Sequence, residues 1–412
     1  MAIYLILLTI LGVASWFSYT KPASLPVAKN LNRVLDDHTK NDKNHIICCV
    51  VIMLILISAC RGLYVGYDTI NYYTHFQYKI GYPEVLIFEP FYEYLNFIVV
   101  KLGLPYSFLL LLCATITFVS FGVAIKRFSI HHTMVFFFLV GLGFLGNTFN
   151  AVRQYLALSM FLFALKYLKD GKFVKYVIFV SLACLFHTSA VILFPLYFIR
   201  YFKLDLKFII IFTILLVAGS FLLEPVVKFI SQFMNFNYYE RYFASGAFKE
   251  QISLYYCLYA LGMVAVFVLF YLLRNKISKC HTDMSNYDLF LMLFFICVSI
   301  RVFGTLCGMF SIINRLNVYF FFSIIFLLPY LVDCMEEVFK KLVLISIFIL
   351  GGAYNLISGL LRETNGVYPY KFIWGNDIVP TIVFYVIIAC LAIIIIKKSA
   401  NLKRFNRIGE MK

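Results

Sequence analysis

The chain alternates long apolar runs with short polar connectors along its whole length. About twenty apolar residues form a helix long enough to cross a lipid bilayer, and a membrane-spanning chain must satisfy its backbone hydrogen bonds internally. A transmembrane barrel would show alternating segments of about ten residues instead. Only 14% of the 412 residues are charged, whereas a soluble domain has about 25%. The pattern predicts an all-α polytopic integral membrane protein, with a single membrane domain over residues 1–412.

The apolar runs predict about thirteen transmembrane helices, within a range of about 11 to 14. A cleavable signal peptide has basic residues before its apolar run. The first apolar run of this chain has none, so we expect it to be a membrane span. The expected spans are residues 1–19, 45–60, 104–125, 133–148, 151–168, 173–186, 188–200, 208–223, 252–273, 289–307, 316–332, 342–358 and 378–396.

Basic residues predict the orientation, because Lys and Arg accumulate in cytoplasmic loops. With the amino terminus outside and the carboxyl terminus in the cytoplasm, 25 of the 36 Lys and Arg residues fall on the cytoplasmic side. This layout also accounts for the net charge of +16 without a nucleic-acid partner. We therefore expect a multi-pass membrane protein in which the three longest outer loops lie on the side opposite the cytoplasm.

Three outer loops are expected, one long and two of medium length, at residues 61–103, 224–251 and 359–377. All are rich in aromatic residues, which favour either an interfacial aromatic belt or a surface on which sugars stack. Tyr72, in the first loop, is a candidate substrate-binding residue. The same loop contains an interfacial helix that starts near Pro90 and places Glu89, Glu93 and Asn96 on one face.

Arg153 and His187 interrupt sequence that is otherwise strongly apolar. The topology places both at outer turns, and the spans that flank His187 have only about 14 and 13 residues, or about 20 Å each. Both side chains should therefore lie recessed below the outer surface. Snorkelling of Arg153 toward water, and a capping or packing role for His187, are the alternative explanations.

Other arginines also lie in the expected outer segments. A guanidinium binds phosphate or carboxylate oxygens with two parallel hydrogen bonds, so these arginines are candidates for binding an anionic substrate. Asp68 and Glu89 are the outer carboxylates nearest to aromatic residues, so each is a candidate general base or the partner of an arginine. The candidate substrate-binding residues are Arg61, Tyr72, Arg153, Gln154, Arg241, Arg301 and Arg315, and the candidate catalytic residues are Asp68, Glu89 and His187.

Other chemistries lack their sequence signals. The eleven cysteines are scattered through apolar sequence without a C-x-x-C pair, which argues against a metal site or a disulfide framework. Nucleophile-elbow, P-loop, dinucleotide-binding and H-E-x-x-H patterns do not occur. We expect neither a metal nor a cofactor.

Five stretches carry a resemblance to a known family: RGLYVGYDTINYYTHF, EPFYEYLNFIV, RQYLALSMFLFALKYL, FHTSAVILFPLYF and NRLNVYFFFSIIFLLP. In this order, over residues 61 to 330, they resemble the EpsG family of polysaccharide polymerases, within the broader Wzy-type O-antigen polymerase group. The first span and the last two spans have no distinctive match.

The resemblance implies transfer of a growing glycan from undecaprenyl pyrophosphate onto another lipid-linked repeat unit, without a metal. Its partners would be lipid-linked oligosaccharides, membrane lipid and a chain-length regulator. The resemblance also implies a location in the bacterial inner membrane, with the active site facing the periplasm. A membrane glycosyltransferase or ligase with another acceptor is one alternative, and a transporter of lipid-linked oligosaccharides is another. A transporter needs polar groups near the bilayer midplane, whereas the polar residues here gather toward one face.

Overall fold

The computed structural model describes residues 2–18, 29–233, 254–335, 366 and 370–410. These residues form helices, and the only β structure among them is two isolated bridges, between Arg61 and Phe372 and between Phe372 and Gly375. The predicted all-α fold is confirmed. The chain divides into two compact units, residues 1–163, 181–188 and 328–412 in the first, and 164–180 and 189–327 in the second.

The helices have the length and hydropathy of a polytopic membrane protein. Within the described residues, five helices are long and apolar enough to cross a membrane, and seven if each of two bent pairs counts as one span. Four shorter apolar helices accompany them. The count of thirteen spans stays a prediction, and the span expected at 342–358 lies outside the described residues, as does most of the expected loops at 224–251 and 359–377.

One expected span differs in type from the prediction. Residues 188–200 form two 3-10 helices, η1 (Thr188–Leu193) and η2 (Pro195–Tyr201), instead of an α-helix. Pro195 lacks a backbone N–H and therefore breaks the regular hydrogen-bond ladder between them. The α-helical hydrogen-bond pattern therefore ends at Phe186, and two 3-10 helices follow His187.

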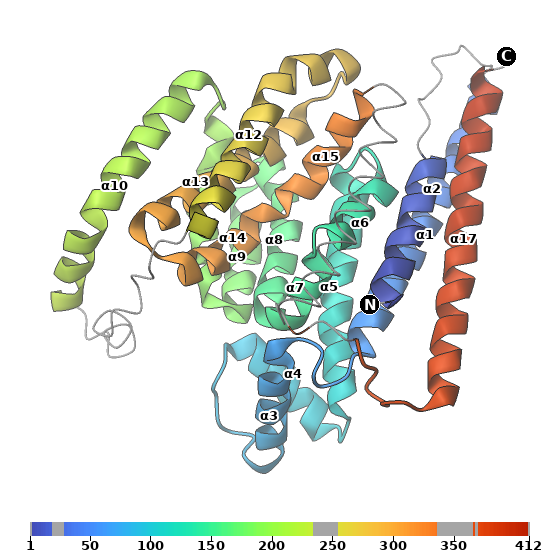
Figure 1. Cartoon of the computed structure of the whole chain (residues 1–412), viewed down its shortest axis with the longest axis horizontal. Coiled ribbons are helices and arrows are strands. Elements are labelled where there is room, and N and C mark those ends of the chain that lie inside the picture. The colour runs from blue at the N-terminus through green and yellow to red at the C-terminus, as the bar shows by residue number, and fades with distance from the viewer. Residues whose placement is uncertain (1, 19–28, 234–253, 336–365, 367–369, 411–412) are drawn as a thin grey trace. The chain divides into compact units, whose positions relative to one another are not determined.

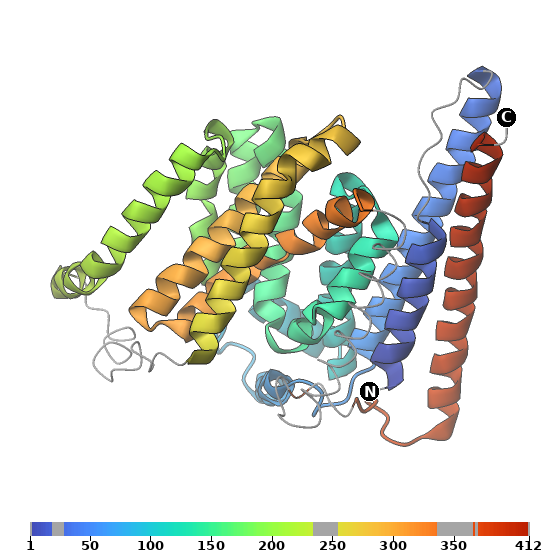
Figure 2. The same ribbon diagram turned by 45° about the horizontal axis from the view of Figure 1, so that its top comes forward.

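Long helices frame the first unit. Helix α17 (Ile378–Glu410) runs beside α1 (Ala2–Ser18) and α2 (Lys29–Ala59), and α2 also packs on α5 (Tyr106–Phe128) (Figures 1 and 2). Lys398 of α17 donates a hydrogen bond to the carboxylate of Asp42 on α2, 2.7 Å away. The amino-terminal end of α17 consequently lies at the same end of the unit as the carboxyl end of α2, where the bridge between Arg61 and Phe372 forms.

In the second unit, α12 (Leu254–Cys280), α13 (Ser285–Cys307) and α14 (Phe310–Phe321) pack in sequence, and α10 (Leu206–Phe233) packs on α13. Arg274 binds Asp288 through two hydrogen bonds of 2.7 Å at the connection between α12 and α13. Gly304 allows α14 to approach α13, because a β-carbon there would lie 2.0 Å from Ile313. Helices α8 (Val152–Asp170), α9 (Phe173–Phe186) and α15 (Ser323–Asp333) have residues in both units.

A broken helix in the first unit prepares the position of Arg153. Helix α6 (His132–Gly141) ends before Gly143, whose φ of 80° is readily adopted only by glycine, and α7 (Phe144–Asn150) leaves at an angle of 58°. Helix α8 begins two residues after α7 ends. The start of α8, with Arg153 and Gln154, therefore sits at the end of a short, sharply turned segment.

The expected loop at 61–103 contains two helices, where sequence reasoning predicted only one. Helix α4 (Pro90–Lys101) is the predicted helix, with proline in its first turn, and α3 (Tyr67–Gly81) precedes it and packs on it. Gly66 is the residue before α3, and its φ of 95° is readily adopted only by glycine. A β-carbon at this position would also lie 3.1 Å from Oδ1 of Asn150, so glycine lets the start of α3 approach Asn150. We call residues 67–101 the α3–α4 module.

Glu93 holds this module together. Its buried carboxylate accepts hydrogen bonds from the backbone N–H groups of Ile87 and Phe88, 2.9 and 2.7 Å away. Nζ of Lys79 and Nε2 of His75, both on α3, lie 2.9 and 3.1 Å from it. Burial tends to raise the pKa of Glu93, but the hydrogen bonds from Lys79 and from the two N–H groups outweigh burial and lower it. The carboxylate therefore fixes the segment immediately before Glu89.

We predict that Glu93→Ala destabilises the α3–α4 module by about 3–5 kcal/mol, because it leaves the ammonium of Lys79 buried without its counterion. The apparent melting temperature of the variant in detergent should fall. In native membranes, trypsin should cleave the variant protein after Lys79. Glu84→Ala is the matched control, since Glu84 is an exposed carboxylate of the same module. Equal melting temperatures for the two variants would contradict this role for Glu93.

Candidate active site

A single carboxylate joins three segments of the first unit. Glu89 precedes α4, and its Oε2 accepts a hydrogen bond from Nη1 of Arg153, in the first turn of α8. Its Oε1 lies 2.6 Å from Nδ1 of His187, which follows α9, and 3.4 Å from the backbone nitrogen of Thr188. Three residues that are 34 to 98 positions apart in the sequence thus meet around one carboxyl group.

The hydrogen-bond geometry assigns the tautomer of His187. Nε2 of His187 lies 3.2 Å from Nε2 of Gln154, and an amide nitrogen can only donate. Nε2 of the imidazole is therefore the acceptor, so Nδ1 carries the proton and donates it to Glu89. In this tautomer the lone pair of Nε2 points at a position that a substrate hydroxyl can take from Gln154.

Arg153 keeps donors for a ligand. Its guanidinium stacks on Phe88, with Cζ 4.1 Å from the ring centroid, and it interacts with the hydroxyl of Tyr72. A guanidinium has five N–H donors. Nε of Arg153 is buried and has no hydrogen-bond partner among the described residues, so the donors that a ligand can reach are on the Nη atoms. The side chain is 22% exposed, so it is recessed but reachable. It can therefore bind an anion while it remains paired with Glu89.

Asn150 connects the start of α3 to the same site. Its Oδ1 lies 3.3 Å from the backbone nitrogen of Asp68, and its carbonyl oxygen accepts a hydrogen bond of 3.3 Å from the hydroxyl of Tyr72. Asp68 is exposed in the first turn of α3. These contacts place Asp68 and Tyr72 beside the turn that leads to Arg153.

The environment of Glu89 keeps its carboxyl group ionised. Partial burial tends to raise the pKa of Glu89, but the hydrogen bond from His187 and the positive charge of Arg153 outweigh burial and lower it to about 2. A carboxylate with so low a pKa is a weak base at neutral pH. Glu89 is better suited to holding and polarising His187 and Arg153 than to accepting a proton itself.

The comparison with known families decides what this membrane protein is. The model of the EpsG family matches residues 44–372, which is most of the chain and includes the whole cluster around Glu89. The chain belongs to the EpsG family. Members of this family are Wzy-like polysaccharide polymerases, so the resemblance seen in the sequence is confirmed, as is a polymerase-type function in general. No curated protein and no solved structure matches the chain.

Six of the ten candidate residues of this EpsG family member meet in one place. They are Asp68, Tyr72, Glu89, Arg153, Gln154 and His187. Their roles stay predictions, but their proximity was not apparent from the sequence.

The remaining four candidates, all arginines, are placed differently. Arg61 is only 3% exposed, stacks on Phe149 and donates to the carbonyl of Ser58, which favours a structural role. Arg301 and Arg315 belong to the second unit, where Arg301 is buried against Tyr259 and Arg315 is exposed. Arg241 lies outside the described residues.

Sequence reasoning missed three contributors to the site: Phe88, Asn150 and Thr188. Asn150 carried the clearest sequence signal. It is a polar residue between two apolar helices, three positions before Arg153, and such a residue indicates a turn held by side-chain hydrogen bonds. Phe88 and Thr188 carried none, since their roles depend on which segments meet.

We predict a pH-dependent stability difference between the wild type and Glu89→Gln. The folded-state pKa of Glu89 lies below its usual value of 4.5, so its ionised form stabilises the fold by about 3 kcal/mol above pH 4.5. This contribution disappears as the pH falls toward 2. Melting curves in detergent should therefore show a constant difference from pH 6 to 8 that shrinks below pH 4.5. A difference that grows on acidification would contradict the assignment.

Proposed function

We propose that the protein polymerises a bacterial surface polysaccharide, an O-antigen, capsule or exopolysaccharide. The reaction transfers the growing glycan from undecaprenyl pyrophosphate onto a sugar hydroxyl of a second lipid-linked repeat unit. The observation that carries this proposal is the Glu89 carboxylate, which holds a guanidinium and an imidazole side by side. Displacement of a pyrophosphate by a hydroxyl is accelerated by a cation that stabilises the leaving group and by a base that accepts the hydroxyl proton.

The reaction forms one bond and breaks another. The acceptor hydroxyl oxygen bonds to the anomeric carbon of the donor, and the bond from that carbon to the pyrophosphate oxygen breaks. Nε2 of His187 takes the hydroxyl proton, and undecaprenyl pyrophosphate leaves with the electron pair of the broken bond. Arg153 binds the leaving group and stabilises its developing negative charge, as preorganised donors do in sites shielded from water.

Glu89 is a positioning residue in this mechanism. Its negative charge stabilises the imidazolium that forms when His187 accepts the proton, in the same way that a buried carboxylate supports a catalytic histidine. It also orients Arg153, whose other N–H groups point at the pyrophosphate. We propose that the charge on the leaving group is balanced by this guanidinium and not by a metal ion. No group of three or more His, Cys, Asp or Glu residues that could hold a metal occurs among the described residues.

We propose that the site faces the periplasm at the outer surface of the inner membrane, with the amino terminus outside and the carboxyl terminus in the cytoplasm. Two observations support this orientation. The segments expected outside meet at one end of the first unit, where Arg61 pairs with Phe372 and Glu89 with His187. Lys398, in the expected cytoplasmic part of α17, binds Asp42.

We predict that Arg153→Ala abolishes long chains and leaves single repeat units, with an unchanged protein level. Loss of a preorganised cation at the leaving group should lower the rate about 10²–10³-fold. Arg153→Lys should recover part of the activity, because an ammonium keeps the charge but not the fork of donors. The measurement is a gel of surface polysaccharide from cells that carry each variant.

Arg200→Ala is the matched control, since Arg200 is an arginine of the second unit that packs on Tyr197 and Tyr201. Ladders of normal length in Arg153→Ala would remove this residue from the mechanism. A single transfer to a different acceptor in the wild type would identify a ligase instead, and movement of the lipid-linked oligosaccharide without any transfer would identify a transporter.

We also predict that the candidate bases differ in importance. His187→Ala should lower polymerisation about 10²–10⁴-fold, the usual contribution of a general base, whereas Asp68→Asn should lower it less than about tenfold, because no catalytic step is assigned to the exposed Asp68 carboxylate. Initial rates with purified protein and lipid-linked repeat units measure both. The reverse order would make Asp68 the base.

A further inference from the structure

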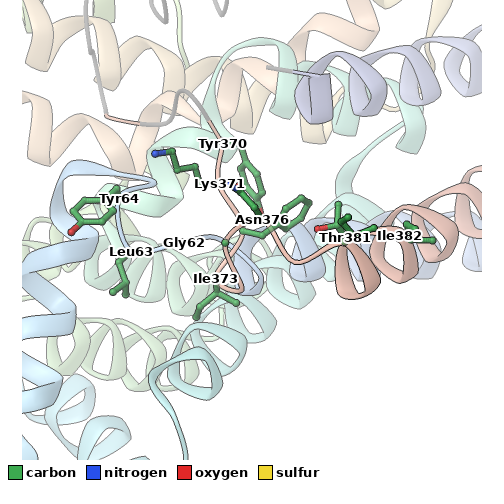
Figure 3. A pocket seen from close by; sticks show the side chains of 12 residues that line it. Gly62, Leu63, Tyr64, Tyr370, Lys371, Ile373, Asn376, Thr381 and Ile382 are labelled. Carbon is green, nitrogen blue, oxygen red and sulfur yellow. The ribbon is translucent and has the colours of Figure 1, made fainter.

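A groove of about 600 Å³ lies at the end of the first unit (Figure 3). None of the residues that line it belongs to the cluster around Glu89. One wall is the segment Gly62–Tyr64, and the other is the segment 370–376 with the first turn of α17. Tyr64 and Lys371 flank one side, while Thr381 and Ile382 lie on the other. This volume is within the usual range for small-molecule sites, about 300–1,000 Å³.

Backbone hydrogen bonds fix the shape of the groove. The nitrogen of Gly62 donates to the carbonyl of Lys371 over 2.7 Å, and the nitrogen of Ile373 donates to the carbonyl of Cys60 over 2.9 Å. Gly62 is required for this approach, because a β-carbon would lie 3.0 Å from the carbonyl oxygen of Phe372. The indole N–H of Trp374 donates a hydrogen bond to the hydroxyl of Thr381, 3.0 Å away, and so ties segment 370–376 to the first turn of α17 within the second wall. The walls are thus held together by bonds that do not use the side chain of Lys371.

The polar part of the groove suits an anion. Lys371 is exposed, and no carboxylate belongs to the described residues that line the groove. The buried guanidinium of Arg61, directly before Gly62, has no carboxylate partner among the described residues, and its Nε has no hydrogen-bond partner there. A buried uncompensated charge is weakly screened and adds positive potential nearby.

The apolar part of the groove continues onto a surface that suits a lipid chain. Ile378 and Ile382 line the groove and are 73% and 56% exposed. Val379, Val383 and Val386 extend this exposed apolar surface along α17. A ligand with an anionic head and a long hydrocarbon tail can therefore place its head near Lys371 and its tail along α17.

The groove is linked to the active-site cluster by a short segment of chain. Residues Gly62–Tyr64 form its wall, and Gly66 follows two residues later, packed against Phe149 and Asn150. Asn150 in turn contacts Asp68 and Tyr72 beside Arg153. A molecule whose head lies in the groove can thus extend a glycan along the Gly62–Gly66 segment toward His187.

We propose that this groove binds the isoprenoid pyrophosphate end of the acceptor substrate, with Lys371 on the pyrophosphate and Ile378 and Ile382 on the first isoprene units. This inference rests on the proposed function, in which two lipid-linked molecules must be bound at once. The pyrophosphate of the donor leaves at the reacting carbon, so it belongs beside Arg153. The pyrophosphate of the acceptor stays attached to its glycan, away from the reacting hydroxyl, and needs a second anion site.

Photolabelling tests the groove without turnover. The full chain, in phosphatidylcholine nanodiscs, is irradiated with an undecaprenyl pyrophosphate that carries a diazirine on its second isoprene unit. We expect label on residues 370–386 and an at least tenfold loss in Lys371→Glu and in Ile382→Trp. Lys371→Arg should keep the label. The matched controls are Lys397→Glu and Ile393→Trp, which make the same changes near the other end of α17.

Competition distinguishes the ligand from other phosphates. Unlabelled undecaprenyl pyrophosphate should displace the label, whereas equal amounts of phosphatidylglycerol or of inorganic pyrophosphate should not. Displacement by phosphatidylglycerol to the same extent would overturn the proposal in favour of a general lipid site. Labelling that neither groove variant changes would also overturn it.

Tail-length dependence tests the assignment to the acceptor. In the wild type, shortening the acceptor tail to two isoprene units should raise its KM at least tenfold, and Ile382→Trp should remove this dependence while the dependence on the donor tail remains. Loss of the donor dependence instead would assign the groove to the donor and overturn the proposal. Because labelling does not need catalysis, it can also be measured in Arg153→Ala, so failure of the polymerase mechanism and failure of the groove give different results.

Discussion

The carboxylate of Glu89 is the interaction on which the candidate site depends. It contacts both Arg153 and His187, which come from the start of α8 and the residue after α9. Without it, the guanidinium of Arg153 would lie partly buried with no anion to balance it, and Nδ1–H of His187 would lose its acceptor, at a cost of several kcal/mol. Its low pKa keeps it charged at neutral pH, so the site is organised before any substrate arrives.

The α3–α4 module exists to place this carboxylate. Glu93 binds the backbone N–H groups of Ile87 and Phe88, and Lys79 and His75 anchor Glu93 in turn. Phe88 then stacks on Arg153 from the other side. A buried ion pair in the α3–α4 module thus fixes the segment that carries Glu89, and with it the geometry of the pairs that Glu89 makes with Arg153 and His187.

Departures from regular helices flank the candidate groups at one end of the first unit. The bend at Gly143 and the short α7 set the start of α8, and α9 gives way to 3-10 helices directly after His187. The same end carries the groove beside Lys371, built by the bridge between Arg61 and Phe372. Under the proposed function, two anion sites at one end let a donor and an acceptor approach each other from within the lipid.

The sequence by itself determined the fold class, the family and the identity of Arg153, His187 and Glu89 as candidates, because apolar run length and isolated polar residues are local properties. It also predicted the helix at Pro90, which proline in the first turn signals. It did not predict α3, because the polar and tyrosine-rich sequence of this helix is typical of an outer loop. Only the tertiary structure decided that Glu89 pairs with Arg153 and His187, that Asn150 holds Asp68, and that Arg61 is buried. Those outcomes depend on contacts between segments far apart in the sequence, such as Glu89 with His187, 98 residues away, and Arg61 with Phe372, which no local pattern encodes.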